Sequence, residues 1–420
     1  MNFNIPLNNS KLPLAKIIPK WGITTYYRGI IIRENPSKGS YETSDRLKSG
    51  FSTIFSSSSV NNQCQTMRIM NLVKSLEEAD IDTYVMTREP NIFYYAGTIG
   101  EGFLIVSSES DPVLIVTMRD LSIAQDQAIG FEVRSYTGQT MMDEVTSVLR
   151  ELRPKAIGFD ELSLKHYRDL GENLGDVELV EKHELVWEMR KVKDPKEQEM
   201  MREAGRLSDI GMEAIRNRIK DGIREHEIAA EASHAMMKEG AEDHAFPFIV
   251  ASGPRSAYPH AGVSDRKIRR GDFVKIDMGA SYRGYKSDNT RTFILGAPTE
   301  EQRKIYETVL EANEAALPEI KDGAAGKEVD KIARDIIENV GYGESFIHGL
   351  GHGVGLEIHE PPSLSKRSKD TLRVGNIVSN EPGIYVKGFG GVRIEDIVLV
   401  TSSGPECLTK FDRDLDAMRV

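Results

Sequence analysis

The chain has 420 residues, of which 39% are hydrophobic and 28% charged, and it carries a formal net charge of −11. This length suits two domains of a globular protein, and the acidic balance argues against nucleic acid and anionic membranes as partners. No apolar run reaches the roughly 18–20 residues that a membrane helix needs. The N-terminus lacks a signal-peptide pattern, and Cys64 and Cys407 form no metal-ligand spacing, so we expect a cytoplasmic protein that acts on small molecules or peptides.

Residues 1–65 differ from the rest of the chain because they show no sustained periodicity and include four consecutive serines at 56–59. This composition predicts a mobile N-terminal extension. As an alternative, Ile30–Ile32 could form an added strand. The first amphipathic helix is predicted to begin near Met67, which could also be the true start of the protein.

Between residues 66 and 190, short β-branched or aromatic runs alternate with helical stretches, which predicts a small α/β domain with its own core. Strands are predicted at 81–87, 102–107, 112–117, 131–136, 156–159 and 177–180, and helices at 140–152 and 165–174. The histidines of this region, His166 and His183, have no potential ligands nearby. We therefore assign this domain a role in shape and specificity.

A helix start signal separates this region from the rest of the chain. Asp194 is a suitable N-cap residue, and Pro195 suits the first helical position. We place the domain boundary here and expect a second domain over residues 191–420.

The second domain contains an internal repeat. The related positions are Lys220–Gly222 with Lys321–Gly323, Glu227-Ile228 with Glu328-Val329 and Gly240 with Gly341 at a shift of 101, then Gly271, Asp277 and Gly279 with Gly375, Glu381 and Gly383 at 104, and Gly284 and Asp288 with Gly391 and Glu395 at 107. The shift grows in small steps, as loop insertions would produce. One supersecondary unit is therefore used twice.

The repeat produces two equivalent pairs of acids, Asp277 with Glu381 and Asp288 with Glu395. In each unit we expect two strands joined through a glycine-containing turn, so that neighbouring strands present both acids to one place. A pseudo-twofold packing of the units would bring all four carboxylates together. They would repel and take up protons unless cations neutralised them, and two divalent ions roughly 3.5–4 Å apart would do so.

Histidines supply the nitrogen donors that such a site needs. His352 lies among glycines, which we interpret as residues that let the backbone approach a metal closely. A nucleotide-binding loop would not place a histidine inside the turn. His260 and His359 are candidates to hydrogen-bond an oxyanion or a substrate amide, whereas His348 has no assigned role.

Arg393 precedes Glu395 by two residues and so shares its strand face. The sequence leaves two roles open for this arginine, because it could bind a substrate carboxylate or pair with a ligand acid.

Six motifs together resemble the prolidase and Xaa-Pro aminopeptidase branch of the pita-bread metallopeptidases over about residues 67–420. The motifs are S-A-Y-P-H, V-K-I-D-M-G, Y-K-S-D-N-T-R-T-F, H-G-L-G-H-G-V-G-L-E-I-H-E-P-P, S-N-E-P-G-I-Y and G-G-V-R-I-E-D. The resemblance implies an α/β N-terminal domain that is creatinase-like and ribonuclease H-like, followed by an α+β pita-bread catalytic domain with a pseudo-twofold repeat. It also implies a homodimer.

The resemblance implies a dinuclear exopeptidase that hydrolyses Xaa-Pro bonds. Its metal ligands would be Asp277, Asp288, His352, Glu381 and Glu395, holding two divalent ions per chain, with Mn²⁺ favoured and Co²⁺, Fe²⁺ or Zn²⁺ as alternatives. Glu381 would shuttle the proton to the leaving nitrogen, His359 would stabilise the tetrahedral intermediate, and His260 would hold the substrate. Arg393 would lie near the prolyl residue. Arg255 departs from the expected pattern and could alter specificity.

Three alternatives to a dipeptidase stay open at this point. An Xaa-Pro aminopeptidase acting on longer peptides would use the same site. A metal-free relative of creatinase type lacks the ligand set, and a non-catalytic homologue would have lost its site. The complete set of five ligands argues against the last two.

Overall fold

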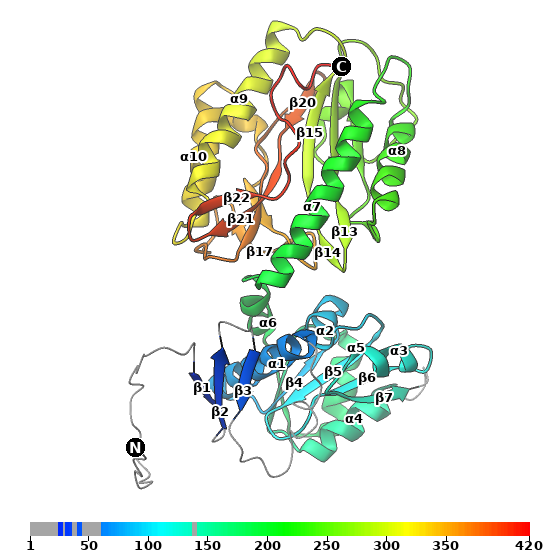
Figure 1. Ribbon diagram of the computed structural model, residues 1–420, viewed down its shortest axis with the longest axis vertical. Coiled ribbons are helices and arrows are strands. Elements are labelled where there is room, and N and C mark those ends of the chain that lie inside the picture. Colours follow the sequence, from blue (N-terminus) through cyan, green and yellow to red (C-terminus); the bar gives the residue numbers. More distant parts are fainter. Residues whose placement is uncertain (1–23, 28–29, 36–39, 44–59, 137–140) are drawn as a thin grey trace. The chain divides into compact units, whose positions relative to one another are not determined.

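The computed structural model describes residues 24–27, 30–35, 40–43, 60–136 and 141–420 (Figure 1). The chain separates into two compact units, Met1–Thr66 and Met67–Val420. The first unit contains an antiparallel sheet of β1 (Thr24–Tyr27), β2 (Ile30–Asn35) and β3 (Ser40–Thr43) in that order. The alternative prediction of a strand at Ile30–Ile32 agrees with β2. The prediction of a mobile extension over residues 1–65 falls largely on residues that lie outside the described ones.

The first helix, α1, covers Val60–Glu78, so the helix start predicted near Met67 is wrong. The prediction relied on the first apolar stripe, whereas residues 60–66 are mostly polar and carry no such stripe. Once a helix has formed, each residue added to its end gains one backbone hydrogen bond. The helix can therefore extend over residues that have no apolar face.

The α/β domain is built on a six-stranded mixed sheet with the order β7-β6-β5-β4-β8-β9. Its strands are β4 (Thr83–Met86), β5 (Gly102–Ser107), β6 (Val113–Thr117), β7 (Glu132–Tyr136), β8 (Ala156–Phe159) and β9 (Glu178–Glu181), and its helices are α2 (Glu89–Ala96), α3 (Leu121–Gln127), α4 (Met141–Leu152), α5 (Leu164–Leu174) and α6 (His183–Arg190). Buried residues of α4 and α5, among them Leu149 and Leu170, join one core with strand residues such as Ile115 and Ile157. The strands and helices predicted here are confirmed to within two residues at their ends.

The helix start at Asp194 is also confirmed, because α7 covers Pro195–Arg216. The Asp194 carboxylate accepts hydrogen bonds from the backbone N–H groups of Lys196 (2.9 Å) and Glu197 (3.0 Å). The Glu197 carboxylate in turn accepts from the Asp194 N–H at 2.8 Å, which completes a capping box.

The remainder of the chain repeats one arrangement of helices and strands. A helix pair, α7 and α8 (Glu225–Lys238), precedes the first group of strands, and a second pair, α9 (Glu300–Ala316) and α10 (Gly326–Asn339), precedes the second group. In the view of Figure 1, α9 and α10 lie to the left of the strands and α8 to their right, and α7 runs in front of them. Repeat-related glycines share left-handed backbone, with φ of 84° at Gly222 and 81° at Gly323. L-residues with a Cβ rarely adopt this conformation, which explains why glycine recurs at both places.

In each half, one bent hairpin carries the acids. The first half contains β10 (Asp243–His244), β11 (Ile249–Ser252), β12 (Phe273–Met278), β13 (Ala280–Tyr282), β14 (Tyr285–Lys286) and β15 (Asn289–Ile294), and the second contains β16 (Gly351–Gly353), β17 (Glu360–Leu364), β18 (Ile377–Asn380), β19 (Gly383–Val386), β20 (Gly390–Arg393), β21 (Asp396–Thr401) and β22 (Gly404–Cys407). β12 pairs with β15 and β13 with β14, and likewise β18 pairs with β21 and β19 with β20. Each hairpin tip thus belongs to a different sheet from its base.

The bends have local causes. A Cβ atom at Gly279 would overlap the carbonyl oxygen of Ser287, so only glycine lets the two arms of the first hairpin come so close there. In the second hairpin Pro382 lacks an N–H and cannot continue the ladder.

One predicted repeat pair needs correction. The glycine at the second hairpin turn is Gly388, with φ of 84° against 79° at Gly284, whereas Gly391 lies inside β20. The extra residues of the second hairpin therefore come after the glycine of its turn.

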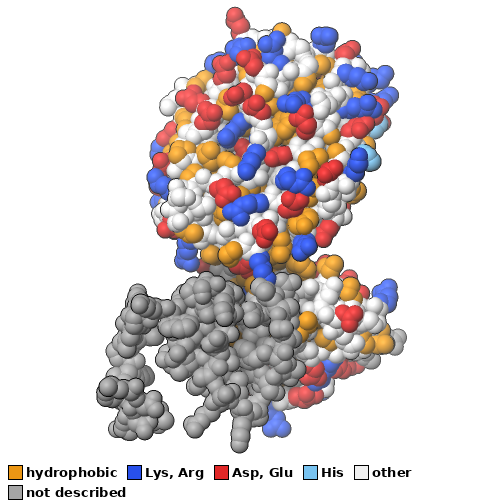
Figure 2. Space-filling view, viewed as in Figure 1, with side chains coloured by type: hydrophobic (Ala, Val, Ile, Leu, Met, Phe, Trp, Pro, Cys, Tyr) orange, Lys and Arg blue, Asp and Glu red, His pale blue; other side chains and the backbone are white. Residues whose placement is uncertain are grey.

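The surface and the helices add two observations. None of the helices in the described ranges has the length and apolar character that a membrane span needs. Figure 2 shows acidic and basic side chains interspersed over the described part of one face.

Candidate active site

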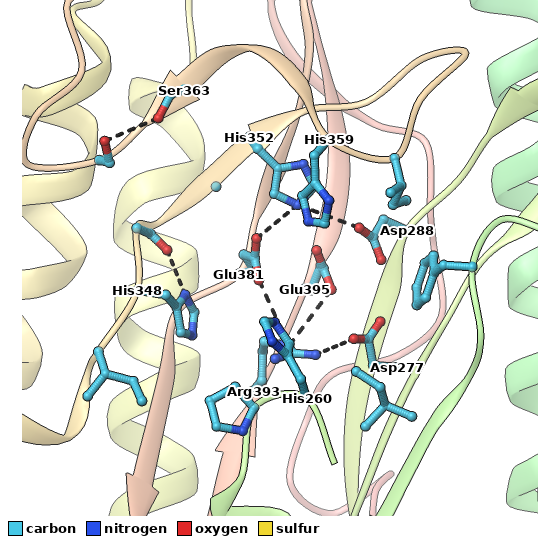
Figure 3. Close-up of a pocket in the computed structure, with 18 of the residues that line it drawn as sticks. His260, Asp277, Asp288, His348, His352, His359, Ser363, Glu381, Arg393 and Glu395 are labelled. Carbon is cyan, nitrogen blue, oxygen red and sulfur yellow. Dashed lines mark hydrogen bonds and ion pairs between the residues drawn. The ribbon is translucent and has the colours of Figure 1, made fainter. Parts of the chain in front are cut away.

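A pocket of about 720 Å³ opens where the two bent hairpins meet (Figure 3). Its lining includes every residue for which the sequence predicted a role in metal or substrate binding. These are His260, Asp277, Asp288, His352, His359, Glu381, Arg393 and Glu395, and His348 lines the pocket with them. The structure therefore brings together residues that are up to 135 positions apart (260 to 395) in the chain.

The four acids all lie at the bends of the hairpins. Asp277 belongs to β12 and Asp288 directly precedes β15, whereas Glu381 directly follows β18 and Glu395 directly precedes β21. At a bend the strand pairing changes from one sheet to another, so side chains from both arms point into the same space (Figure 3).

His352 reaches the acids because β16 packs closely on β18. A Cβ atom at Gly351 would overlap the carbonyl oxygen of Ser379, and one at Gly353 would overlap backbone oxygens of β17. The glycines around His352 thus allow close approach to neighbouring strands, which corrects the interpretation that they approach a metal. The Nδ1 of His352 donates to the Gly353 carbonyl at 3.0 Å, and this bond orients the ring so that Nε2 points toward the acids.

The ligand atoms lie within reach of a common ion. His352 Nε2 is 3.2 Å from Glu381 Oε1 and 3.7 Å from Asp288 Oδ2. One ligand atom each of Asp288, His352 and Glu395 lies within 4.8 Å of the others. The distances between these atoms are short enough for one cation to contact several of them.

The electrostatics of the cluster favour a cation. Burial, followed by repulsion from the neighbouring carboxylates, raises the pKa values of Asp288 and Glu395 well above their ordinary values. Burial would also raise the pKa of Glu381, but the hydrogen bond with His352 and the charges of His352, His348 and Arg393 together outweigh it and lower that pKa to about 2. A divalent ion would stabilise all of these carboxylates in their charged form.

Unpaired oxygen atoms test this fit. Asp277 Oδ1, Asp288 Oδ1 and Glu395 Oε1 are buried and make no hydrogen bond with any described residue. Buried polar atoms without a partner are rare and costly. Three unpaired carboxylate oxygens next to the imidazole of His352 form a set of oxygen and nitrogen donors. Hard and borderline divalent ions prefer such donors, so the residues fit a metal.

Arg393 contacts one of the predicted ligands. Its Nη2 donates to Asp277 Oδ2, and its Nε lies 3.9 Å from Glu381 Oε2 and 4.0 Å from Glu395 Oε2. The arginine is buried, with 3% of its surface exposed. Of the two roles that the sequence left open, this geometry supports pairing with a ligand acid.

The other pocket histidines differ in how they are held. His260 and His359 are exposed, and neither makes a hydrogen bond with a described residue. The His359 ring centroid lies 4.3 Å from that of His352, and the partial burial of the ring together with the charge of His352 lowers the His359 pKa. His348, by contrast, donates from Nδ1 to the Gly349 carbonyl (2.7 Å) and accepts at Nε2 from the Tyr385 hydroxyl (2.9 Å).

Arg255 does not line the pocket. Its guanidinium donates to the buried carboxylate of Glu225 and to the carbonyl of Gly262, at 2.6 Å for the latter. These contacts assign Arg255 to the support of the loop that carries His260.

Sequence reasoning missed three polar residues that contact the acids or the loop of His260. Ser379 donates to Glu381 Oε1 (3.1 Å), Thr290 donates to Glu395 Oε2 (2.6 Å), and Lys275 contacts the loop of His260. Each lies two residues from a predicted ligand along an extended segment, and so on the same face. That spacing is a signal in the sequence that could have identified them.

Comparison with known proteins agrees with this geometry. Residues 199–402 match the model of metallopeptidase family M24, and residues 68–192 match the creatinase/prolidase N-terminal domain. The Xaa-Pro dipeptidase of Pyrococcus furiosus is 40% identical over 351 residues, which are 83% of this chain and 99% of that protein.

Two solved structures are similar to this chain over most of its length. The Xaa-Pro dipeptidase from Bacillus anthracis has a TM-score of 0.81 at 39% identity and covers 85% of this chain and 100% of its own. The X-Pro aminopeptidase from Thermotoga maritima has a TM-score of 0.75 at 36% identity and covers 84% of this chain and 100% of its own. From the fold, the acid and histidine cluster and these matches together, the chain belongs to metallopeptidase family M24 and carries a creatinase/prolidase N-terminal domain.

Proposed function

We propose that this metallopeptidase hydrolyses the bond between an N-terminal residue and proline, with dipeptides as its first substrates and two divalent ions in its site. One observation carries the proposal, namely that Asp277, Asp288 and Glu395 each have a buried oxygen atom that no described residue hydrogen-bonds, close to His352. The names of similar proteins, Xaa-Pro dipeptidases among them, support the choice of substrate.

Five residues would together hold the two ions, namely Asp277, Asp288, His352, Glu381 and Glu395. Bound there, the ions would supply Lewis acidity that activates water and polarises the scissile carbonyl group. Mn²⁺ is favoured, and Co²⁺, Fe²⁺ or Zn²⁺ also suit these donors.

Glu381 is the proposed proton carrier. Its Oε1 accepts a hydrogen bond from the Ser379 hydroxyl at 3.1 Å and lies 3.2 Å from His352 Nε2, close enough for one ion to contact both atoms, whereas Oε2 makes no hydrogen bond with a described residue. Oε2 can therefore accept a proton from the attacking water and deliver it to the leaving nitrogen of proline. Delivery is required because the proline nitrogen leaves as an amine.

His359 and His260 are the proposed substrate-binding groups. Both imidazoles line the pocket, and their ring N–H groups are not used by other described residues. They can donate hydrogen bonds to the oxyanion that develops on the attacked carbonyl, and to the substrate itself. For Arg393 we propose that it holds Asp277 and lies near the prolyl residue.

The alternative is an Xaa-Pro aminopeptidase that acts on longer peptides. It is kept because a protein with that name is about as similar as the dipeptidases are. The discriminating experiment compares hydrolysis of Ala-Pro with that of Ala-Pro-Ala, with and without added Mn²⁺. A preference for the tripeptide would replace the dipeptidase assignment, and the absence of hydrolysis of both would reject the proposal.

Glu381→Gln tests the assigned chemistry in the same assay. We expect it to lose nearly all activity, and full activity would disprove the proton-carrier role. Metal analysis of the purified protein addresses the remaining alternatives, because a folded protein that binds no Mn²⁺ or Co²⁺ would be a metal-free or non-catalytic relative.

Three further points are proposals that rest on the sequence and the resemblance. The chemistry is confined to residues 191–420, with residues 66–190 forming a separate domain and 1–65 an extension. The protein is a homodimer, and it works in the cytoplasm.

A further inference from the structure

Lys275 is a fully buried lysine in β12, two residues before Asp277. Its ammonium group makes no ion pair with any carboxylate of the described residues. Instead, Nζ donates to the carbonyl oxygens of Tyr258 at 2.7 Å and Pro259 at 3.1 Å, and it lies 4.9 Å from the centre of the Tyr385 ring. The two carbonyls thus accept from two of the three N–H donors of the lysine, and the face of the Tyr385 ring lies beside the charged group.

Such a burial requires an explanation. Removing an ammonium group from water is costly, and most buried lysines recover that cost through a carboxylate partner. Here the partners are two consecutive backbone carbonyls of an otherwise exposed loop. The most direct consequence of these contacts is that the loop is held in one place.

The residue that follows these carbonyls is His260. Its side chain is exposed and makes no hydrogen bond with a described residue, so its position in the pocket depends on its backbone. That backbone follows a short 3₁₀ helix, Gly253–Ala257, and is closed by a turn in which the Ala261 N–H donates to the Tyr258 carbonyl at 3.3 Å. Lys275 contacts the segment directly beside the histidine.

The internal repeat provides independent support. At the shift of 104 that relates Asp277 to Glu381, Lys275 corresponds to Ser379. The Ser379 hydroxyl accepts from the backbone N–H of His352 at 3.0 Å. In both halves, therefore, the side chain two residues before the acid is bonded to the backbone that carries a pocket histidine.

We infer that Lys275 is a positioning residue, which fixes the loop of His260 so that this imidazole faces the substrate. The inference rests on the proposed function of His260. The effect of Lys275 on the loop can be tested separately from activity, because the lysine should hold the loop even when no substrate is bound.

Lys275→Met is the appropriate variant, because it keeps the apolar stem and removes the N–H donors. In hydrogen exchange without substrate, amides of residues 257–262 should exchange at least about tenfold faster than in the unmodified protein. Ile276→Val is the matched control, since Ile276 is buried on the opposite face of the same strand and belongs to the hydrophobic core. The control should leave exchange in this loop unchanged.

The functional test is a double-mutant cycle with His260→Ala on an Xaa-Pro peptide, with metal content measured for every variant. Lys275→Met alone should lower kcat/KM by about tenfold to a hundredfold at unchanged metal content. In the His260→Ala background it should have almost no further effect. If Lys275→Met does not fold, Lys275→Gln is used in the same way.

Two results would overturn the inference. One is a loop that exchanges no faster in the lysine variant than in the Ile276→Val control. The other is an equal loss of kcat/KM with and without His260, which would indicate a general effect on the site. If no variant and no unmodified protein cleaves an Xaa-Pro peptide, the proposed function fails, and the exchange experiment alone decides about Lys275.

Discussion

Thr290 and Glu395 join the two halves of the catalytic domain at a predicted metal ligand. The Thr290 hydroxyl donates to Glu395 Oε2 at 2.6 Å, and the Glu395 N–H donates to the Thr290 carbonyl at 3.0 Å. Thr290 belongs to the first hairpin and Glu395 to the second. The contact between the repeats is therefore also the contact that orients a carboxylate of the site.

Removing the hydroxyl should weaken metal binding. Thr290→Val keeps the shape of the side chain but leaves Glu395 without its orienting donor, and changes of this kind typically reduce metal affinity about 10–100-fold. A Mn²⁺ titration followed by calorimetry measures the effect. Thr308→Val is the control, because Thr308 is also buried but its hydroxyl donates to the Lys304 carbonyl of its own helix and contacts no described acid. Equal affinities for the two variants would contradict the orienting role.

Removing the metal should destabilise the protein. Four clustered carboxylates repel one another, so chelation is expected to lower the melting temperature, and added Mn²⁺ should restore it in a concentration-dependent way. Glu395→Gln removes one of the charges. We expect the metal-free variant to melt no lower than the metal-free unmodified protein, while the rise with Mn²⁺ is largely lost. A full rise in the variant would exclude Glu395 as a ligand.

The segment that carries His359 depends on Arg190. This buried arginine donates to Glu357 Oε2 at 2.8 Å and Glu360 Oε2 at 2.6 Å, the acids on either side of the Ile358-His359 pair. Arg190→Met would leave Glu360 buried with fewer partners, and we expect a loss of about 3–5 kcal/mol in the free energy of unfolding.

The control for this variant is Arg202→Met. Arg202 also forms a two-pronged pair, with both Glu406 oxygens at 2.8 Å, but its side chain is 43% exposed. The expected loss there is at most about 1 kcal/mol, because water screens the pair. Urea unfolding of both variants measures the difference, and similar losses would show that burial of the Arg190 network is unimportant.

Asp209 should make stability depend on pH. Burial raises the pKa of this carboxyl from 3.8 to about 6, although it accepts backbone hydrogen bonds from Lys410 and Phe411 at 2.7 and 3.1 Å. Between these two pKa values the folded protein keeps a proton that the unfolded chain has released. The contribution of Asp209 to stability is therefore complete below about pH 4 and is lost as the pH rises through about 6.

Asp209→Asn removes this titration and keeps an acceptor oxygen. The difference in unfolding free energy, unmodified protein minus variant, should fall by about 1–3 kcal/mol between pH 4 and pH 7. Chemical unfolding across that range measures it. A difference that stays constant, or one that grows with pH, would be inconsistent with a raised pKa.

Much of this architecture is encoded locally. The capping box at Asp194 and the left-handed glycines of the repeat follow from backbone chemistry that neighbouring residues supply, so short patterns suffice to predict them. The pairing of the acids can also be predicted from the sequence, because a duplicated unit repeats its ligands at a nearly constant shift. These features required no knowledge of how the halves pack.

The partners of the site residues depended on the packing of the two halves. Strand alternation places Arg393, Thr290 and Lys275 on the same face as a ligand. It does not specify that Arg393 contacts Asp277, that Thr290 contacts Glu395 or that Lys275 contacts the loop of His260. The first two contacts join positions more than 100 residues apart. Which polar group a buried side chain meets is set by the approach of whole hairpins, and the chain order alone does not specify that approach.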